Sequence, residues 1–218
     1  MREIELDLLL KVRKYSRYAV SLAIVLSFAF ARFIDDSEIT WQVIIALIAL
    51  AIGIPHGALD HLVTLPRSNP TKMAIFIVIY IAIALVAIWA ILQWNVWGFI
   101  AVVAMSATHF GIGDSAFIAE LNQLSSRKRT QLATWSYAAA AGSIPVVIPL
   151  INSRSTEALE KVNPVLINWH HGFESEILIG VSLIATGAIL ILARERQYRD
   201  LVDITALIAL VSFAPPLV

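Results

Sequence analysis

The sequence contains no cysteine. A chain without cysteine forms no disulfide, offers no thiolate nucleophile and cannot hold an iron–sulfur cluster or zinc through sulfur. Any metal bound by this chain must therefore have nitrogen and oxygen ligands, which directs attention to its five histidines and its carboxylates.

Charged residues are also scarce, at 15% of the 218, whereas hydrophobic residues make up 59%. Soluble domains usually contain about 25% charged residues. The basic residues form no patch beyond short loops, so nothing supports binding to nucleic acid. Because only short polar breaks separate the hydrophobic runs, the composition indicates one membrane domain over residues 1–218.

The longest uncharged stretch runs from Met73 to Gly113. It is long enough for two helical crossings of a hydrocarbon core about 30 Å thick, and Gln93 and Asn95 mark the turn between them. The strict alternation of a porin-type strand is missing. We therefore predict an all-α, polytopic integral membrane helical bundle with seven visible transmembrane helices. The expected spans are 18–34, 41–63, 73–92, 96–118, 130–151, 175–193 and 201–218.

Basic residues are distributed unevenly over the expected loops. One side of the membrane carries 13 of the 16, in the N-terminal segment and after the second, fourth and sixth spans. The other side carries Arg32, Arg154 and Lys161. The positive-inside rule then predicts a multi-pass protein of the plasma membrane with a cytoplasmic N-terminus. The first apolar stretch lacks a cleavage site before Asp35 and is not a typical signal peptide.

Two of the expected spans contain histidine. The second ends with GIPHGALDH at 53–61, and the fourth includes SATHFGIGD at 106–114. Ionisable groups are costly to bury in a bilayer and usually serve a function there. His56 and His109 lie roughly 20 Å along two parallel helices, at nearly equal depth. Because neutral imidazole is a common ligand of iron, zinc and copper, both are candidate metal ligands.

The same two segments contain carboxylates and glycines. Asp60 follows His56 by one helical turn, and Asp114 follows the second histidine by five residues. Both are candidate catalytic groups that orient a ligand or accept a proton. Glycines such as Gly111 and Gly113 let another helix or a ligand approach the backbone.

Other interpretations of these residues stay open. A membrane histidine often only hydrogen-bonds a neighbouring helix. His56 and His109 are also suitable axial ligands for a b-type haem. Asp60 and Asp114 are suitable carboxylates for proton or ion transport. A purely structural membrane subunit is a further alternative.

The remaining histidines are weaker candidates. His61 lies near the expected cytoplasmic boundary of its span, and His170 and His171 lie in the longest outer loop. We interpret all three as interfacial residues.

The two motifs together resemble those of the bacteriorhodopsin-related protein (Brp/Blh) family of membrane-embedded β-carotene 15,15′-dioxygenases. The resemblance extends from about the second span to APPLV at 214–218. It implies a non-haem Fe(II) enzyme that uses O₂ to split the central double bond of β-carotene into two molecules of retinal. Carried over to this sequence, the iron ligands are His56 and His109, and Asp60, His61 and Asp114 are supporting groups.

The implied substrates are β-carotene and O₂. An apolar carotene dissolves in the bilayer, so the site is expected to open between helices to the lipid. Dry walls would keep water away from the reaction. Phe110, Ala104 and Ala107 are candidates for lining such a slot. The sequence indicates no oligomeric state.

The family pattern also includes a part that this sequence lacks. In the family, two further ligand histidines, spaced four apart, lie on a final helix beyond an Ala-Pro-Pro stretch. Here the sequence ends at Val218, after an uncharged run from Ile204 that spans only about 22 Å as a helix. We therefore expect that an eighth helix is missing, that the sequence is a fragment or a truncated product, and that it lacks activity by itself.

Overall fold

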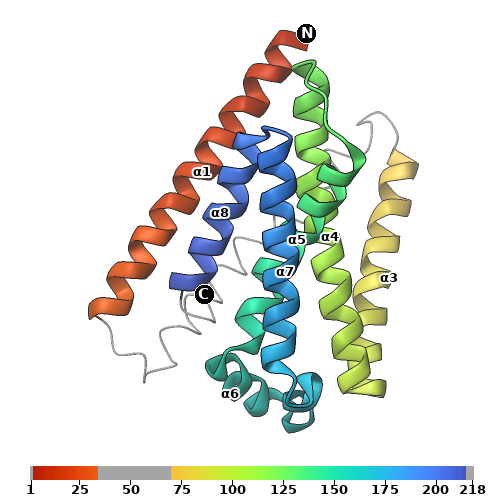
Figure 1. Ribbon diagram of the computed structural model, residues 1–218. Helices are drawn as coiled ribbons and strands as arrows, with labels where there is room; N and C mark the ends of the chain where they lie inside the picture. The colour runs from red at the N-terminus through yellow and green to blue at the C-terminus, as the bar shows by residue number, and fades with distance from the viewer. Residues whose placement is uncertain (1, 34–69, 215–218) are drawn as a thin grey trace.

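The computed structural model describes residues 2–33 and 70–214. Every regular element within these ranges is a helix (Figure 1). The elements are α1 (Arg2–Phe33), α3 (Pro70–Trp94), α4 (Val96–Leu124), α5 (Gln131–Ile151), α6 (Ser153–Val162), η1 (Pro164–His170), α7 (Glu174–Arg194) and α8 (Tyr198–Phe213). The predicted all-α fold is confirmed for this part of the chain.

Four helices are long and apolar enough to cross a membrane, namely α3, α4, α5 and α7. They contain the expected spans 73–92, 96–118 and 175–193, and α5 covers the expected span 130–151 except for residue 130. The expected spans 18–34 and 201–218 fall largely in α1 and α8, which are not among these four; α8 has only 16 residues. The span expected at 41–63 lies outside the described residues. The count of seven transmembrane helices therefore stays a prediction.

Helix α5 is the centre of the bundle and packs against α4, α7 and α8. Small residues allow this close packing: Ala133 and Ala140 are fully buried. A Cβ atom on Gly142 would lie 1.9 Å from the carbonyl oxygen of Ala107, and one on Gly111 would lie 2.0 Å from the carbonyl oxygen of Ala138. The backbones of α4 and α5 therefore touch, as predicted for Gly111, whereas a Cβ atom on Gly113 would meet nothing within 4 Å.

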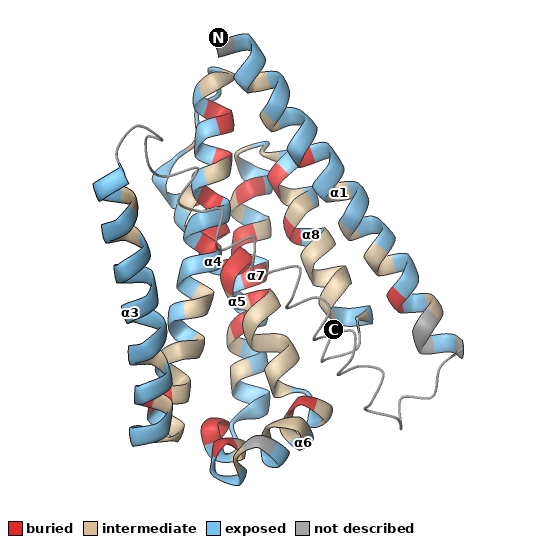
Figure 2. Ribbon diagram, turned by 180° about the vertical axis from the view of Figure 1, so that it is seen from behind, coloured by how far each residue is buried: buried red, intermediate tan, exposed pale blue. Residues whose placement is uncertain are grey.

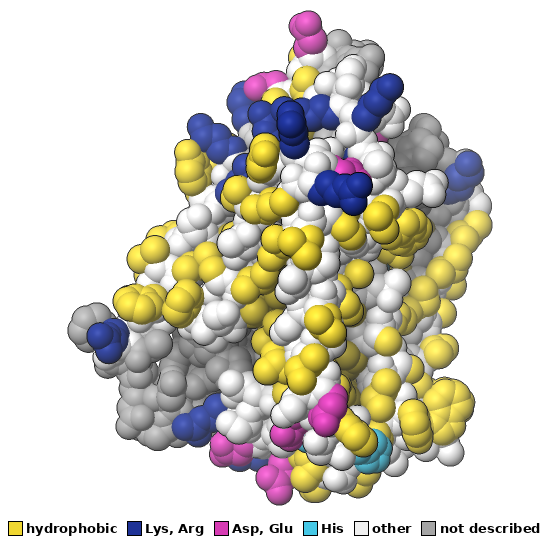
Figure 3. Space-filling model, viewed as in Figure 1, with side chains coloured by type: hydrophobic (Ala, Val, Ile, Leu, Met, Phe, Trp, Pro, Cys, Tyr) yellow, Lys and Arg dark blue, Asp and Glu magenta, His cyan; other side chains and the backbone are white. Residues whose placement is uncertain are grey.

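The outside of the bundle is apolar, as lipid contact requires. Buried positions lie along the central helices, whereas α3 is exposed along most of its length (Figure 2). Hydrophobic side chains cover the middle of the surface, and charged ones gather at its two ends (Figure 3). Most Lys and Arg side chains in this view lie at the end that carries the N-terminus, which the basic residues predict to be cytoplasmic.

Candidate functional site

His109 lies in the middle of α4, on its surface. Its side chain is exposed, and its ring meets that of Phe110 edge-on at 5.8 Å. A helix turns by about 100° per residue, so Asp114 points about 140° away from His109 around the axis. Ile112 and Ala116, three and seven residues after His109, lie much closer to its direction. The two candidate residues of the second motif therefore do not share a helix face.

Asp114 is instead bound to α5. The hydroxyl of Tyr137 donates a hydrogen bond of 2.6 Å to its Oδ2 atom. Tyr137 is 1% exposed, and the guanidinium of Arg129 lies 4.9 Å from the centre of its ring. Asp114 is thus joined to a loop arginine through this tyrosine. No signal in the sequence singled out Tyr137, because an aromatic residue in an apolar helix usually belongs to the core or to the interfacial belt.

This chain of contacts continues into α8 and α1. Arg129 lies 3.4 Å from Asp200, which also forms an ion pair of 2.5 Å with Arg13. Arg13 and Arg17 both contact Asp203, at 2.5 and 2.6 Å. We call these five residues, with Tyr137 and Asp114, the polar network. It links α1, α4, α5 and α8 at the end expected to be cytoplasmic.

Electrostatics shows that the arginines of the polar network need their carboxylates. Burial by itself lowers the pKa of Arg13, but the contacts with Asp200 and Asp203 outweigh it and leave this pKa above its ordinary value. Burial is also the main influence on Arg129, whose pKa is lowered despite the charge of Asp200. An arginine side chain stays charged at neutral pH, so the loss of a counterion would leave an unpaired buried cation at this end of the bundle.

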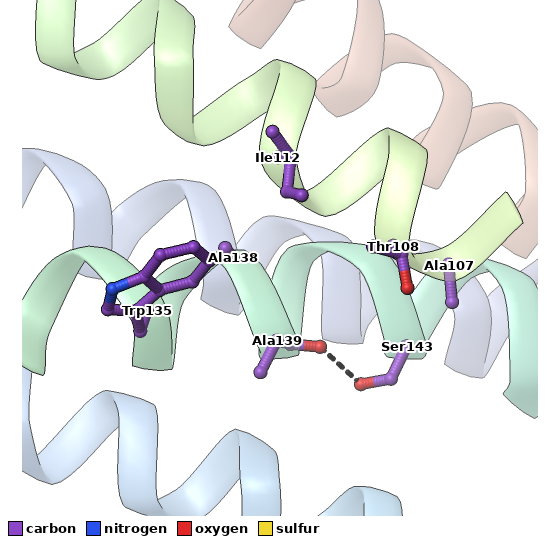
Figure 4. A pocket seen from close by; sticks show the side chains of 7 residues that line it. All are labelled: Ala107, Thr108, Ile112, Trp135, Ala138, Ala139 and Ser143. Atoms are coloured by element: carbon purple, nitrogen blue, oxygen red, sulfur yellow. Dashed lines mark hydrogen bonds between the residues drawn. The ribbon is translucent and has the colours of Figure 1, made fainter. Parts of the chain in front are cut away.

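A hollow lies between α4 and α5 on the flank of their contact (Figure 4). Two cavities of about 210 and 170 Å³ share Ile112, Trp135 and Ala138, and so form one elongated groove. The other lining residues are small: Ala107, Thr108, Ser115, Ala116, Ala119, Thr134, Ala139 and Ser143. Ala107 was expected to line a slot; Phe110 and Ala104 are not among the lining residues.

The groove is apolar in spite of its hydroxyl groups. Thr108 donates to the carbonyl oxygen of Ala104 at 2.8 Å, and Ser143 donates to that of Ala139 at 2.7 Å. These two hydroxyls are therefore satisfied within their own helices, a usual arrangement in membrane helices, whereas Ser115 of α4 donates to the carbonyl oxygen of Thr134 in α5 at 3.4 Å. An apolar chain in the groove would leave these three hydroxyls hydrogen-bonded.

The described residues do not complete a metal site. Within 2–33 and 70–214, no group of three or more His, Asp or Glu side chains could hold a metal ion. His56, Asp60 and His61 lie outside the described residues. Of the proposed ligands the described part contains His109 alone, so the ligand set stays a prediction.

His170 is more buried than expected for an interfacial residue. It ends η1 with its side chain 9% exposed, packed against Trp169 at 5.5 Å between ring centres. The backbone N–H of Gly172 donates to its Nδ1 atom at 3.3 Å. Trp169 contacts Phe99 at the start of α4, about 15 Å before His109 along the helix. His170 therefore lies at the opposite end of α4 from the polar network, while His171 is exposed.

A comparison with protein-family models identifies the chain. The model described as beta-carotene 15,15′-dioxygenase matches residues 46–218, which is most of the sequence and includes both histidine motifs. The chain belongs to the β-carotene 15,15′-dioxygenase family. The resemblance stated for the two motifs is thereby confirmed. Searches of curated proteins and of solved structures give no match.

Family membership gives the groove a context. α4 and α5 both lie within the matched range, and the groove between them is lined mainly by apolar side chains. The dioxygenase family acts on a hydrocarbon that partitions into lipid, and the groove lies on the flank of helices that are apolar enough to cross a membrane.

Proposed function

We propose that the protein cleaves β-carotene with O₂ at the central double bond. One carbon–carbon double bond breaks, each carbon receives one oxygen atom, and two molecules of retinal result. The observation that carries this proposal is the family match, which covers both histidine motifs. The apolar groove beside the face of α4 that carries His109 supports it.

The proposed metal is Fe(II), with His56 and His109 among its ligands. Bound iron would supply the activation of O₂ that no side chain of this chain can provide. The exposed position of His109 on α4 is compatible with a ligand from another segment. We propose Asp60 as a further supporting group on the basis of the motif alone.

The contribution proposed for Asp114 follows from its hydrogen bond to Tyr137. Asp114 points away from His109, so it acts through the structure rather than on the polyene. Its bond fixes the rotation of α4 against α5, and this rotation determines where His109 points. Asp114 is therefore a positioning residue in this proposal.

The groove is proposed to bind part of the polyene. Its walls are Ile112 and Trp135, and its floor is the close contact of the α4 and α5 backbones. Binding there would orient the chain along α4 and exclude water from the reacting bond. The substrate would enter sideways from the lipid.

The test is retinal production in bacterial cells that accumulate β-carotene. The complete open reading frame of the gene is expressed as the parent protein, with His56→Ala and His109→Ala as variants and His171→Ala as the matched control at an exposed histidine. We expect chromatography to show retinal for the parent protein and for the control, and none for the two other variants. Unchanged β-carotene with the parent protein would disprove the activity, and full activity of His109→Ala would disprove the ligand assignment.

A further inference from the structure

Four cationic side chains gather where the α4–α5 connection meets the α7–α8 turn. Arg127, Lys128, Arg196 and Arg199 are all exposed, and we call them the cationic cluster. The Nε2 atom of Gln197 donates to the carbonyl oxygen of Lys128 at 3.1 Å, which holds the two connections together. Lys and Arg side chains are dense at this end of the surface (Figure 3).

A second contact holds the same two connections together and involves Glu195, a carboxylate of the α7–α8 turn. The hydroxyl of Thr130 donates to Glu195, and the backbone N–H of Thr130 lies 3.5 Å from the other carboxylate oxygen. Among the described residues, Glu195 is therefore engaged by Thr130 and forms no ion pair with an arginine or a lysine. The cationic cluster is a defined arrangement, since both of its connections are held together at two points.

The described residues do not neutralise the cationic cluster. Among the described residues, no carboxylate forms an ion pair with any of its four side chains. Asp200 and Asp203, the acidic residues of the neighbouring α8, are bound by the arginines of the polar network. The positive charge of Arg127 is the main reason that the pKa of Arg199 lies below its ordinary value. Arg127 and Arg199 thus repel each other, and an anion placed between them would relieve that repulsion.

The apolar neighbours of the cationic cluster indicate its depth in the membrane. Leu132 and Trp135, in the first turns of α5, are each 63% exposed, and Tyr198 at the start of α8 is 62% exposed. Exposed aromatic and apolar side chains directly beside cations are typical of the membrane–water interface. The cationic cluster therefore lies where lipid headgroups lie.

We infer that the cationic cluster binds the phosphate headgroups of anionic phospholipids, such as phosphatidylglycerol, in the cytoplasmic leaflet. Guanidinium groups bind phosphate oxygens through charge-assisted hydrogen bonds, and two unpaired guanidiniums beside each other match the charge and the several oxygens of one phosphate. Each Lys or Arg near an anionic leaflet strengthens binding about fivefold. The inference is independent of carotene cleavage, because it uses residues that have no part in the proposed reaction.

Native mass spectrometry of the purified full chain tests this inference. The protein is released from micelles that contain equal amounts of phosphatidylglycerol and phosphatidylcholine, and the retained lipid is counted. We expect preferential retention of phosphatidylglycerol by the parent protein. The variant Arg127→Gln/Arg199→Gln should retain it about 25-fold more weakly, whereas Arg154→Gln/Lys161→Gln, with the same charge change at the other end, should retain it normally.

Two further measurements distinguish headgroup binding from a loss of folding and from binding of free phosphate. Arg127→Lys/Arg199→Lys preserves the charge and should keep most of the selectivity for phosphatidylglycerol. This variant still tests the inference if the glutamine variant does not fold. Equal retention of the two lipids by the parent protein would overturn the inference. So would equal losses in the two glutamine variants, or displacement of the lipid by millimolar inorganic phosphate, which would indicate a site for the free ion.

Discussion

Replacing Asp200 by Asn tests the polar network directly. Asp200 is 2% exposed, and it pairs with Arg13 at 2.5 Å and with Arg129 at 3.4 Å. In the variant, Arg13 keeps Asp203 as its partner, whereas the described residues offer no other ion-pair partner to Arg129, whose side chain is 5% exposed. Breaking a buried ion pair costs about 3–5 kcal/mol, because the remaining charge is left without a partner. We expect a loss near the lower limit, about 3 kcal/mol, because only one of the two arginines loses its sole counterion.

The assay is unfolding of the purified protein in mixed micelles with increasing SDS, followed by circular dichroism. The matched control is Asp7→Asn, which breaks an ion pair of 2.6 Å with Lys11 on α1, where both side chains are about 60% exposed. An exposed pair contributes little, so the control should unfold like the parent protein. If Asp200→Asn also unfolds like the parent protein, the reasoning about this buried cluster is wrong.

A second substitution identifies the cause of the loss. Changing Arg129 to Met in the Asp200→Asn background removes the unpaired charge but keeps most of the side-chain volume. The double variant should therefore recover part of the lost stability, because an apolar side chain there is less costly than an unpaired cation. A double variant that is less stable than Asp200→Asn would show that Arg129 stabilises the bundle through its other contacts.

Three further predictions concern the contact between α4 and α5. Gly142→Leu should prevent stable folding, because the added Cβ meets backbone at 1.9 Å, whereas Gly180→Leu, with nothing within 4 Å, should leave the melting temperature unchanged. Tyr137→Phe should lose about 1.5 kcal/mol in the SDS assay, since a part-buried hydrogen bond to a carboxylate is removed. Ser143→Leu should fill the groove and reduce retinal formation at least tenfold. The control Ser182→Leu, on the exposed face of α7, should leave retinal formation unchanged. Equal activity of these two variants would contradict substrate binding in the groove.

The helices that the sequence predicted best are the ones with long uncharged runs. The span expected at 73–92 is found within α3 (Pro70–Trp94), and the one at 96–118 within α4 (Val96–Leu124). Hydrophobicity defines the part of a helix that contacts lipid, but the backbone hydrogen bonds continue into the polar flanks. These two predicted spans are therefore shorter than their helices.

The segment after α5 shows where hydrophobicity gives no guidance. Residues 152–174 were expected to form one outer loop, yet they contain α6 and η1. Local signals for both elements are present: the side chain of Asn152 accepts from the N–H of Arg154, and that of Asn163 accepts from Val165. A search for capping residues would have found these two starts.

The polar network was harder to predict, because its contacts join residues far apart in the sequence. Arg13 and Arg17 were interpreted only as cytoplasmic charges, although both bind α8. One local signal existed: Asp200 and Asp203 are spaced by three residues at the start of an otherwise apolar helix. Two carboxylates on one face of such a helix require cationic partners from elsewhere in the bundle.

The geometry of α4 limits how an iron site can be assembled in this protein. Gly111 points about 160° away from His109 around the helix axis, and its side of α4 is covered by the backbone of α5. Asp114 faces the same neighbour through Tyr137. A second ligand must therefore approach His109 from the side of α4 that faces away from α5. If His56 binds the same iron, the first motif must lie on that side of α4. The distance between residues 56 and 109 is therefore a direct test. It can be measured between paired spin labels on two introduced cysteines, because the chain contains no other cysteine. A separation well beyond about 15 Å between the two Cα atoms would exclude a shared metal, because two imidazoles bind one ion at only about 2 Å each.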